Sequence, residues 1–286
     1  MESYNIYQDQ LSVVQIDGQG ETGANFFKSY QLIQHISNQN LSITFMREGL
    51  RLKADIAIIN IAEYPFVIGH LVDILHDEEL SYFNALQFEK RKKEYLLAHY
   101  AAKIVSSSYL CESDFSQVEI ASGYFRQPIV KYKAPDIPEI SLSHCADIAV
   151  AISCDCGHPI GIDVEKLDPK RTSILKSQLT EKEQSWVSEQ DVTDMVLYNQ
   201  LWTIKESLSK AIKCGLTVPF EVLEIQKQYF HNDFLICEFK NFGQYKCYSW
   251  VVNGYALSIT VPKKTEISLD IDELKCKLIS DSSVTD

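Results

Sequence analysis

The chain has 286 residues, of which 45% are hydrophobic and 23% charged, and its formal net charge is −12. This length exceeds one typical domain and the apolar content suffices for a sizeable core, so we expect two lobes. The acidic balance argues against a nonspecific nucleic-acid-binding protein. No apolar run approaches a membrane span and no charged-then-apolar leader opens the chain, so we expect a cytoplasmic protein without membrane contact.

Strands and helices alternate along the first half of the chain. Short apolar runs predict strands at residues 11–15, 41–45, 55–61, 118–120 and 129–132. Longer patterns predict helices at residues 25–35 and 76–108, the second in one or two pieces. A segment with two prolines, residues 133–138, is a natural linker to the second half.

The second half opens with strands at residues 140–143 and 148–153. After a turn at 155–159, residues 160–165 are expected to return as the hairpin partner of the preceding strand. The turn contains Cys154-Asp155-Cys156, but none of the eight cysteines forms a C-x-x-C pair, so the spacing indicates neither a zinc site nor a redox pair. Free thiols are the simplest reading.

Two helices and four strands complete the expected order. Thr180 and Glu183 form a capping box that starts one helix, and an apolar face predicts another over residues 201–212, with Gly215 as its C-terminal cap. The strands are expected at residues 222–228, 234–239, 245–252 and 255–261, the last two joined by an Asn253-Gly254 turn. From residue 265 we expect a polar, acidic tail, disordered at 281–286. Helices alternating with mainly antiparallel strands indicate an α+β protein.

Two carboxylates share one face of a predicted strand. Asp163 and Glu165 lie two residues apart in Gly161-Ile162-Asp163-Val164-Glu165, so they project together while Ile162 and Val164 face a core. Paired carboxylates repel and raise each other's proton affinity unless a cation lies between them. The pair therefore favours a metal site over placement at a strand edge or on the surface.

A third carboxylate lies on a predicted helix. Trp202, Glu206 and Lys210 recur at every fourth residue along one stripe. Mg²⁺ usually takes one to a few carboxylates together with substrate phosphates, and nearby lysines suit the remaining phosphate charge. The simpler alternatives remain open: Glu206 and Lys210 as an ordinary helix ion pair, Lys205 as a solvated lysine, Trp202 as core packing, and His144 as a structural histidine.

Taken together, these motifs resemble the 4′-phosphopantetheinyl transferases of the surfactin-synthetase-activating type. That family has G-[IV]-D-[VIL]-E, then about forty residues later W-x-x-K-E-[SA]-x-x-K, and both are complete here at residues 161–165 and 202–210. The family's Ser-His pair has its counterpart in Ser143-His144. More loosely, residues 91–103 resemble the family's basic helix and residues 123–128 its G-x-x-K-P element.

The resemblance implies two similar lobes in one chain, a pseudo-dimer, each with a mainly antiparallel sheet and packed helices. We expect a segment before the lobes at residues 1–54, the lobes at residues 55–138 and 139–264, and the acidic tail at 265–286. A fused pair of lobes leaves little need for another protomer, so a monomer is expected.

The reaction that the resemblance implies is transfer of 4′-phosphopantetheine from coenzyme A to a serine of an apo acyl or peptidyl carrier protein, with release of 3′,5′-ADP. Asp163, Glu165 and Glu206 would hold Mg²⁺ against the pyrophosphate. His144, Lys205 and Lys210 would neutralise phosphate oxygens, and Glu206, Glu165 or a metal-bound water would take the serine proton. Further candidates for binding coenzyme A are Arg91, Lys93, Arg126 and Ser143.

Two other functions fit parts of the pattern. A Mg²⁺-dependent phosphohydrolase of a nucleotide or diphosphate would use the same metal clamp with a water nucleophile and no protein acceptor. A non-catalytic carrier-binding protein would keep the fold, but the intact acids and lysines argue against it. The sequence does not choose the carrier or the pathway.

Overall fold

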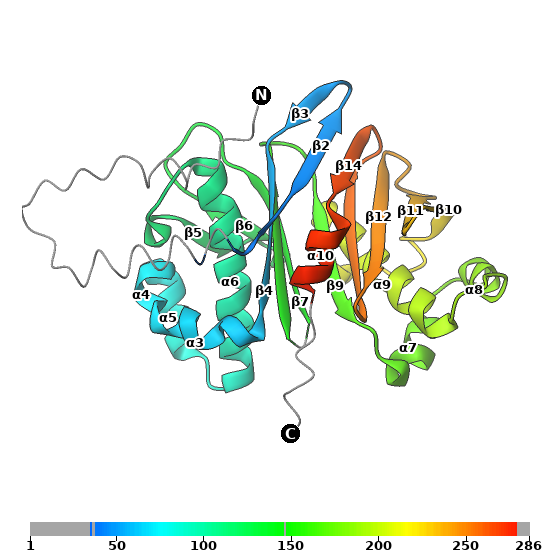
Figure 1. Cartoon of the computed structure of the whole chain (residues 1–286), viewed down its shortest axis with the longest axis horizontal. Helices are drawn as coiled ribbons and strands as arrows, with labels where there is room; N and C mark the ends of the chain where they lie inside the picture. Colours follow the sequence, from blue (N-terminus) through cyan, green and yellow to red (C-terminus); the bar gives the residue numbers. More distant parts are fainter. Residues whose placement is uncertain (1–34, 36–37, 146, 279–286) are drawn as a thin grey trace, which may run out of the picture.

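The computed structural model describes residues 35, 38–145 and 147–278 (Figure 1). The strand expected at 11–15, nearly all of the helix expected at 25–35 and the disordered end expected at 281–286 lie outside these residues. Within them, the fold is a mixed one of helices and antiparallel sheets, as the alternation of patterns predicts.

The first half carries one strand, a group of helices and four strands. Strand β4 (Ala54–Asn60) leads through a short 3-10 turn into α3 (Tyr64–Gly69), α4 (Leu71–Ile74), α5 (Asp77–Ala85) and α6 (Glu89–Leu110). The strands that follow are β5 (Glu119–Ser122), β6 (Pro128–Lys131), β7 (Glu139–Cys145) and β8 (Ile148–Cys154). The helical pattern expected over 76–108 is therefore two helices, α5 and α6, with His76 as the N-terminal cap of the first.

The second half repeats that order of elements. Strand β9 (Gly161–Lys166) is followed by α7 (Thr172–Ser177), α8 (Glu181–Ser188) and α9 (Asp194–Ala211). Four strands then follow: β10 (Ile225–His231), β11 (Phe234–Phe239), β12 (Tyr245–Val252) and β13 (Tyr255–Pro262). The Asn253-Gly254 turn between the last two is confirmed, because both residues have positive φ, 49° and 82°. Helix α9 ends at Ala211 instead of at Gly215, with Lys213 at φ 57° in the left-handed region.

The strand pairing also repeats. In the first sheet β4 pairs with β8 and β8 with β7, and in the second β9 pairs with β13 and β13 with β12, all antiparallel. The hairpin expected between 148–153 and 160–165 is therefore wrong. Both edges of β8 are already taken by β4 and β7, so β9 joins a strand some ninety residues later in the sequence instead.

An apolar layer joins the two sheets. Alternate residues of β4 and β9, such as Ile56 and Ile162, meet in one buried cluster together with Leu257 of β13. The opposite face of the first sheet carries α6, and the opposite face of the second carries α9 (Figure 1). The order of layers is therefore helix, sheet, sheet, helix. In β9, the even-numbered residues Ile162 and Val164 point into the apolar layer between the sheets, and the odd-numbered residues point toward α9.

The two ends of the described chain meet in a small third sheet. Strand β2 (Ile43–Arg47) pairs with β3 (Leu50–Leu52) on one side and with β14 (Thr265–Leu269) on the other, and β1 (Asn40–Leu41) pairs with β4. A last helix, α10 (Ile271–Lys277), follows β14. The sequence predicts a polar tail from residue 265, whereas Ile267, Leu269 and Leu274 pack against the apolar layer and give this segment a fixed structure.

The same buried ion pair occurs once in each half. Glu79, the third residue of α5, contacts Lys103 of α6 at 2.5 Å and accepts a hydrogen bond from Ile120 N. Glu183, the third residue of α8, contacts Lys205 of α9 at 2.7 Å and accepts one from Ile225 N. Both glutamates complete capping boxes, which confirms the cap expected at Thr180. Each pair thus ties a helix start, a long helix and a strand together.

Removing one member of such a pair leaves an unpaired charge in the core. We expect Lys205→Met to lower the free energy of unfolding by about 3–5 kcal/mol, and Lys103→Met by a similar amount. Lys213→Met is the control. The Lys213 side chain is 46% exposed and that of its partner Glu139 is 26% exposed, so this ion pair contributes at most about 1 kcal/mol to the free energy of unfolding. Urea unfolding of the three variants at pH 7 measures this, and a loss below about 1 kcal/mol for Lys205→Met contradicts the pairing.

Candidate functional site

The site is built on the face of β9 that looks toward α9. Ile162 and Val164 are 0% and 1% exposed in the apolar layer, so Asp163 and Glu165 project to the other side of the sheet. Both carboxylates act electrostatically on Glu206 of α9. The spacings predict that these three carboxylates share a site, and in the structure Asp163 and Glu165 lie near enough to Glu206 to raise its pKa.

Asp163 has one engaged oxygen and one free oxygen. Its Oδ1 accepts hydrogen bonds from Ser143 Oγ of β7 at 2.7 Å and from Lys210 Nζ of α9 at 2.6 Å. Lys210 Nζ also donates to the backbone oxygen of Ile162 at 3.1 Å. Asp163 is only 4% exposed, yet its Oδ2 is buried without a hydrogen-bond partner among the described residues. Such an oxygen is costly unless something else fills its place.

Glu206 carries the strongest electrostatic signature of the site. Burial, and then the neighbouring carboxylates of Asp163 and Glu165, raise its pKa to about 7, against the opposing effects of Lys210 and Arg171. No ion pair involves Glu206 in the part of the chain that the structure describes. A carboxyl group whose pKa is raised toward neutrality suits a group that exchanges protons.

Arg171 is a site residue that the sequence reasoning missed. It ends the 3-10 turn after β9 (Pro169–Arg171), and its NH1 lies 2.7 Å from Glu165 Oε2. Its guanidinium also lies over the Trp202 ring, 5.8 Å from the centroid. Burial raises the pKa of Glu165, and the hydrogen bond from Arg171 opposes that rise. No motif in the sequence marks this arginine.

The glycine that opens the strand motif has a steric role. A Cβ atom at Gly161 would lie 1.9 Å from the backbone oxygen of Ser207 and 2.7 Å from Ala211 N. Helix α9 therefore rests directly on the backbone of β9. This contact brings Glu206 and Lys210 within reach of the two strand carboxylates.

Lys205 does not belong to the site, although it stands beside Glu206 in the sequence. Its side chain is 0% exposed, and its Nζ contacts Glu183 Oε2 at 2.7 Å and the backbone oxygen of Phe220 at 3.1 Å. We expected Lys205 to contact coenzyme A, but its buried ion pair with Glu183 gives it a structural role instead. One helical step turns a side chain by about 100°, which separates Lys205 in the core from Glu206 in the site.

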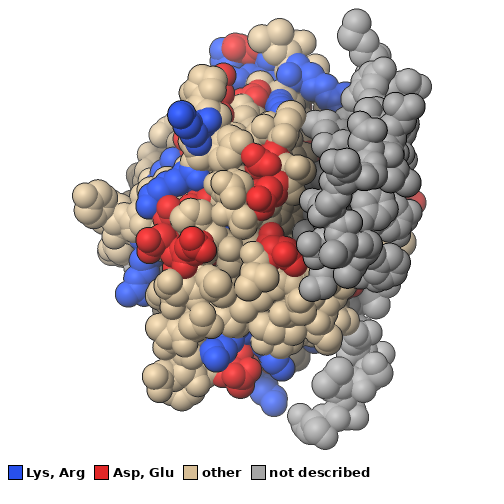
Figure 2. Space-filling view, turned by 90° about the vertical axis from the view of Figure 1, so that its left-hand side faces the viewer, with Lys and Arg blue, Asp and Glu red and all other residues tan. Residues whose placement is uncertain are grey.

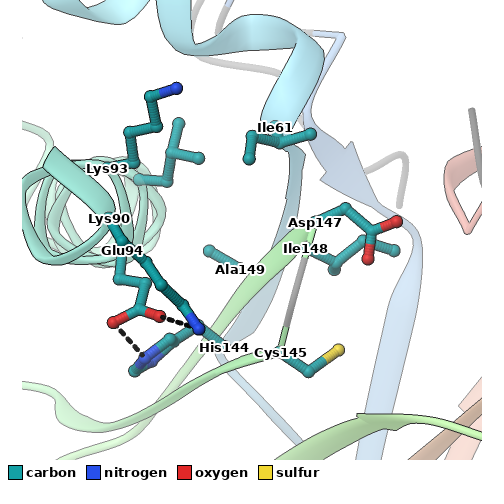
Figure 3. A pocket seen from close by; sticks show the side chains of 10 residues that line it. Ile61, Lys90, Lys93, Glu94, His144, Cys145, Asp147, Ile148 and Ala149 are labelled. Carbon is teal, nitrogen blue, oxygen red and sulfur yellow. Dashed lines mark ion pairs between the residues drawn. The ribbon is translucent and has the colours of Figure 1, made fainter. Parts of the chain in front are cut away.

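A pocket of about 430 Å³ lies between α6, β7 and β8 (Figure 3). Lys90, Lys93 and Glu94 of α6 line one side and His144 lines another, with His144 Nε2 3.7 Å from Glu94 Oε2. Because neighbours on a strand face opposite ways, Ser143 reaches Asp163 while His144 reaches the pocket. Burial lowers the pKa of His144, and Glu94 opposes this, while Lys210 lowers it further.

The remaining basic candidates are more exposed. The Arg91 side chain is 68% exposed and its NH1 lies 3.1 Å from Glu94 Oε2, and Lys93 Nζ lies 5.2 Å from the Tyr64 ring centroid. Figure 2 shows the helical side of the first half, where basic and acidic side chains intermingle. Arg126 is exposed at φ 63° and has no ion pair within the described ranges.

Among residues 35, 38–145 and 147–278, no group of three or more His, Cys, Asp or Glu side chains stands in an arrangement ready to hold a metal ion. In the same residues no helix is both long and apolar enough to cross a membrane.

The segment that carries this site is similar to known proteins. Residues 159–260, which contain Asp163, Glu165, Glu206 and Lys210, match the model of the 4′-phosphopantetheinyl transferase superfamily. It is 29% identical over 157 residues to 4′-phosphopantetheinyl transferase gsp of Aneurinibacillus migulanus, covering 51% of this chain. It is 26% identical over 124 residues to 4′-phosphopantetheinyl transferase Sfp of Bacillus subtilis, covering 43% of this chain.

These matches are partial. They span 62% and 53% of the two relatives' own lengths. A solved holo-(acyl-carrier-protein) synthase from Bacillus anthracis, in complex with CoA (3′,5′-ADP), is 20% identical and covers 41% of this chain and 96% of its own. Its TM-score is 0.33, a value at which the two folds support no comparison.

The contact at Gly161 predicts a sharp steric effect. We expect Gly161→Ala to lower the free energy of unfolding by about 3 kcal/mol, because its Cβ meets backbone that cannot rotate away. Gly69→Ala is the matched control, since nothing lies within 4 Å of its Cβ, and its stability should stay within about 1 kcal/mol. Thermal and urea unfolding compare the two. Equal stabilities would show that α9 does not rest on β9.

The raised pKa of Glu206 predicts how stability depends on pH. Since the folded-state pKa of about 7 lies above the ordinary 4.5, ionisation of Glu206 destabilises the folded protein increasingly from pH 4.5 to 7 and fully above that. Glu206→Gln should therefore match the wild type near pH 4.5 and exceed it by roughly 2–3 kcal/mol at pH 8. Urea unfolding in a chelator from pH 4.5 to 8 measures the difference, and a constant difference across that range would refute the assignment.

Proposed function

We propose that this chain transfers the 4′-phosphopantetheine group of coenzyme A to a serine of an apo carrier protein, releasing 3′,5′-ADP. One observation carries the proposal: Asp163 holds a buried, unpartnered oxygen in a cluster with Glu206 and Lys210, inside the segment that matches the superfamily. The pocket lined by Lys90, Lys93 and His144, together with Glu94 and Asp147, supports it, because its two lysines could contact the phosphates of coenzyme A. The acceptor is an acyl or peptidyl carrier protein, and the enzyme is a cytoplasmic monomer.

The acidic cluster fits a divalent cation. Asp163 Oδ2 is an oxygen without a partner, and Glu206 is a carboxylate whose proton affinity its acidic neighbours raise. A cation between the two groups removes both penalties. Mg²⁺ is the expected ion; Asp163, Glu165 and Glu206 would hold it, and it would supply charge neutralisation for the pyrophosphate.

Side chains of the protein stabilise the developing charge, accept the proton and orient the site. Lys210, held by Asp163 and the Ile162 carbonyl, faces the charge that develops as the pyrophosphate bond breaks. Glu206 is the proton acceptor for the serine hydroxyl, since a carboxylate that holds an ion through one oxygen has a second oxygen for the proton. Ser143 orients Asp163 through its hydrogen bond. His144, with Lys93 and the pocket residue Lys90, contacts the phosphates of coenzyme A, and Arg91 lies at the rim.

The repeated halves support the pseudo-dimer that the resemblance implies. The order of elements, the strand pairing and the buried Glu–Lys pairs all occur twice. In this proposal the first lobe runs to Cys154 instead of ending near residue 138, because β7 and β8 pair with β4. Coenzyme A would lie where α6 and β7 of the first lobe approach β9 and α9 of the second.

Transfer is tested by the mass of the acceptor. After incubation with the protein, coenzyme A and Mg²⁺, an apo acyl or peptidyl carrier should gain one phosphopantetheine, and a chelator should prevent this. Asp163→Ala should reduce the rate at least about a hundredfold while the protein stays folded, because it removes the anchor of Lys210 and the free oxygen together. Asp191→Ala, an exposed change on the same half, is the control and should act as the wild type.

The outcome also separates the alternatives. Loss of phosphate from coenzyme A without modification of any carrier would favour the Mg²⁺-dependent phosphohydrolase. Carrier binding without either reaction would favour the non-catalytic binding protein. Normal transfer by Asp163→Ala would contradict the assignment of the site.

A further inference from the structure

We propose that Thr203 of α9 and Ser258 of β13 are positioning residues. The hydrogen bond between their hydroxyl groups holds α9 in the orientation at which Lys210 meets Asp163. This inference rests on the proposed function for its kinetic consequences, and one part of its test does not need transfer. Thr203 stands at an open position of the resembled family's helix motif, and Ser258 lies outside the motifs.

A row of hydroxyl groups lies under α9, where the helix packs on β12 and β13. The row consists of five residues that are each 0% exposed, two on the helix and three on the strands: Thr203, Ser207, Ser249, Ser258 and Thr260. Thr203 Oγ1 lies 2.7 Å from Ser258 Oγ, and Ser207 Oγ lies 2.7 Å from Thr260 Oγ1. Because a buried hydroxyl group costs free energy unless it is hydrogen-bonded, these contacts tie the helix to the sheet.

The contact between Thr203 and Ser258 has a defined donor. Ser258 Oγ donates its single proton to Ser249 Oγ at 2.8 Å, so Thr203 supplies the proton of its own contact with Ser258. Thr203 shares that proton with the backbone oxygen of Gln200 at 2.9 Å. A residue without a hydroxyl group at position 203 therefore leaves Ser258 bonded to Ser249 and removes only the tie to the helix.

The hydrogen bond of Thr203 lies beside a functional strand residue, because Ser258 is the cross-strand partner of Asp163 in β9. The backbone contact at Gly161 restrains α9 at Ser207, and Thr203 lies about one helical turn before that point. A helix that is held at one turn can still pivot about it. A second contact one turn away fixes both the rotation and the tilt of the helix.

Thr203 and Lys210 lie on the same face of α9, since residues 203, 206, 207 and 210 follow the spacing of one helical face. A rotation of the helix that breaks the contact of Thr203 also withdraws Lys210 Nζ from Asp163 Oδ1, which lies 2.6 Å away. Apolar contacts tolerate a small rotation because they are non-directional, whereas a hydrogen bond weakens steeply with angle. The hydroxyl contact therefore supplies the precision that the apolar core of the second half lacks.

The first half of the chain holds its long helix differently. Lys103 is the counterpart of Lys205 in the repeated buried ion pair. Two positions on either side of Lys103, α6 carries the buried apolar residues Ala101 and Val105, where α9 carries Thr and Ser. The strand residue Ser153 donates to the backbone oxygen of Val105 at 3.2 Å instead of to a helix side chain. Side-chain hydroxyl contacts at these two positions thus accompany the carboxylate cluster and are not needed for the fold.

Two substitutions at one position separate hydrogen bonding from packing. Thr203→Val keeps the shape of the side chain and loses the hydroxyl group, whereas Thr203→Ser keeps the hydroxyl group and loses a methyl group. With coenzyme A and an apo carrier protein, we expect Thr203→Val to lower kcat about tenfold and to leave each KM within about twofold, because misplacement of a reacting group acts on the chemical step. Thr203→Ser should keep kcat within about twofold of the wild type, and Ser258→Ala should act as Thr203→Val does.

The control comes from the first half. Ser153→Ala removes a buried hydroxyl group that bonds to the backbone of α6, and it should leave kcat within about twofold of the wild type. Urea unfolding of every variant establishes that the protein is folded before its kinetics are compared.

The position of Lys210 can be measured without transfer. Acetylation of the substrate-free protein, followed by mass spectrometry, gives the rates of labelling at Lys210 and at Lys213. Lys210 is held by Asp163, whereas Lys213 follows the end of α9 and pairs with Glu139. We expect Thr203→Val to raise the rate at Lys210 relative to Lys213 at least about threefold, because an ammonium group released from a carboxylate is more available. Thr203→Ser should leave the ratio unchanged.

Several results would overturn the proposal. Equal kcat values for Thr203→Val and the wild type would show that the hydroxyl group positions nothing. Equal damage in Thr203→Ser would assign the effect to packing, and equal damage in Ser153→Ala would assign it to the loss of any buried hydroxyl group. A lower kcat with an unchanged labelling ratio would separate Thr203 from Lys210. If the wild type transfers nothing, the proposed function fails, and the labelling ratio alone decides whether Thr203 positions Lys210.

Discussion

The direct contact of α9 with the backbone of β9 is the constraint on which the site depends. At Gly161 there is no room for even one methyl group, and one helical turn of α9 runs against that point. The contact fixes the helix both in distance and in rotation, since Ser207 faces the strand while Glu206 and Lys210 lie beside it. A site made from two elements can hold its side chains in place only if the elements themselves cannot shift, and here backbone touches backbone.

The buried charged side chains form two kinds of arrangement. The Glu79–Lys103 and Glu183–Lys205 pairs are closed, because each carboxylate also caps a helix and accepts a strand N–H. The cluster around Asp163 is open, with an unpartnered oxygen and a carboxyl group whose pKa is raised to about 7. Closed pairs stabilise the fold, whereas the open cluster stores unfavourable energy that a bound ion or substrate can relieve.

Sequence reasoning found the parts of the site that follow from local periodicity. The alternation along 161–165 placed Asp163 and Glu165 on one face, and the four-residue spacing put Glu206 and Lys210 on one stripe. The predictions were wrong where residues or strands adjacent in the sequence lie apart in the structure. Lys205 is buried in the core although Glu206 beside it belongs to the site, and β9 pairs with β13 instead of with the preceding strand β8. Arg171 was missed because a lone arginine after a turn carries no pattern, and the tail was misjudged because the partner strand of β14 is more than two hundred residues away.

The pairing of β2 with the distant β14 has a consequence for folding during synthesis on the ribosome. Strand β2 is among the first described segments to be synthesised, yet its partner β14 is among the last, and Arg47 and Thr265, which bond across them, are 218 residues apart. Until residues 265–269 have been synthesised, one edge of β2 has its backbone N–H and C=O groups unpaired, and such an edge can associate with other chains. The apolar layer under α10 is likewise uncovered until then. Strand β14 therefore covers the open edge of β2. A chain truncated before residue 265 would leave that edge exposed, and we expect it to aggregate more readily.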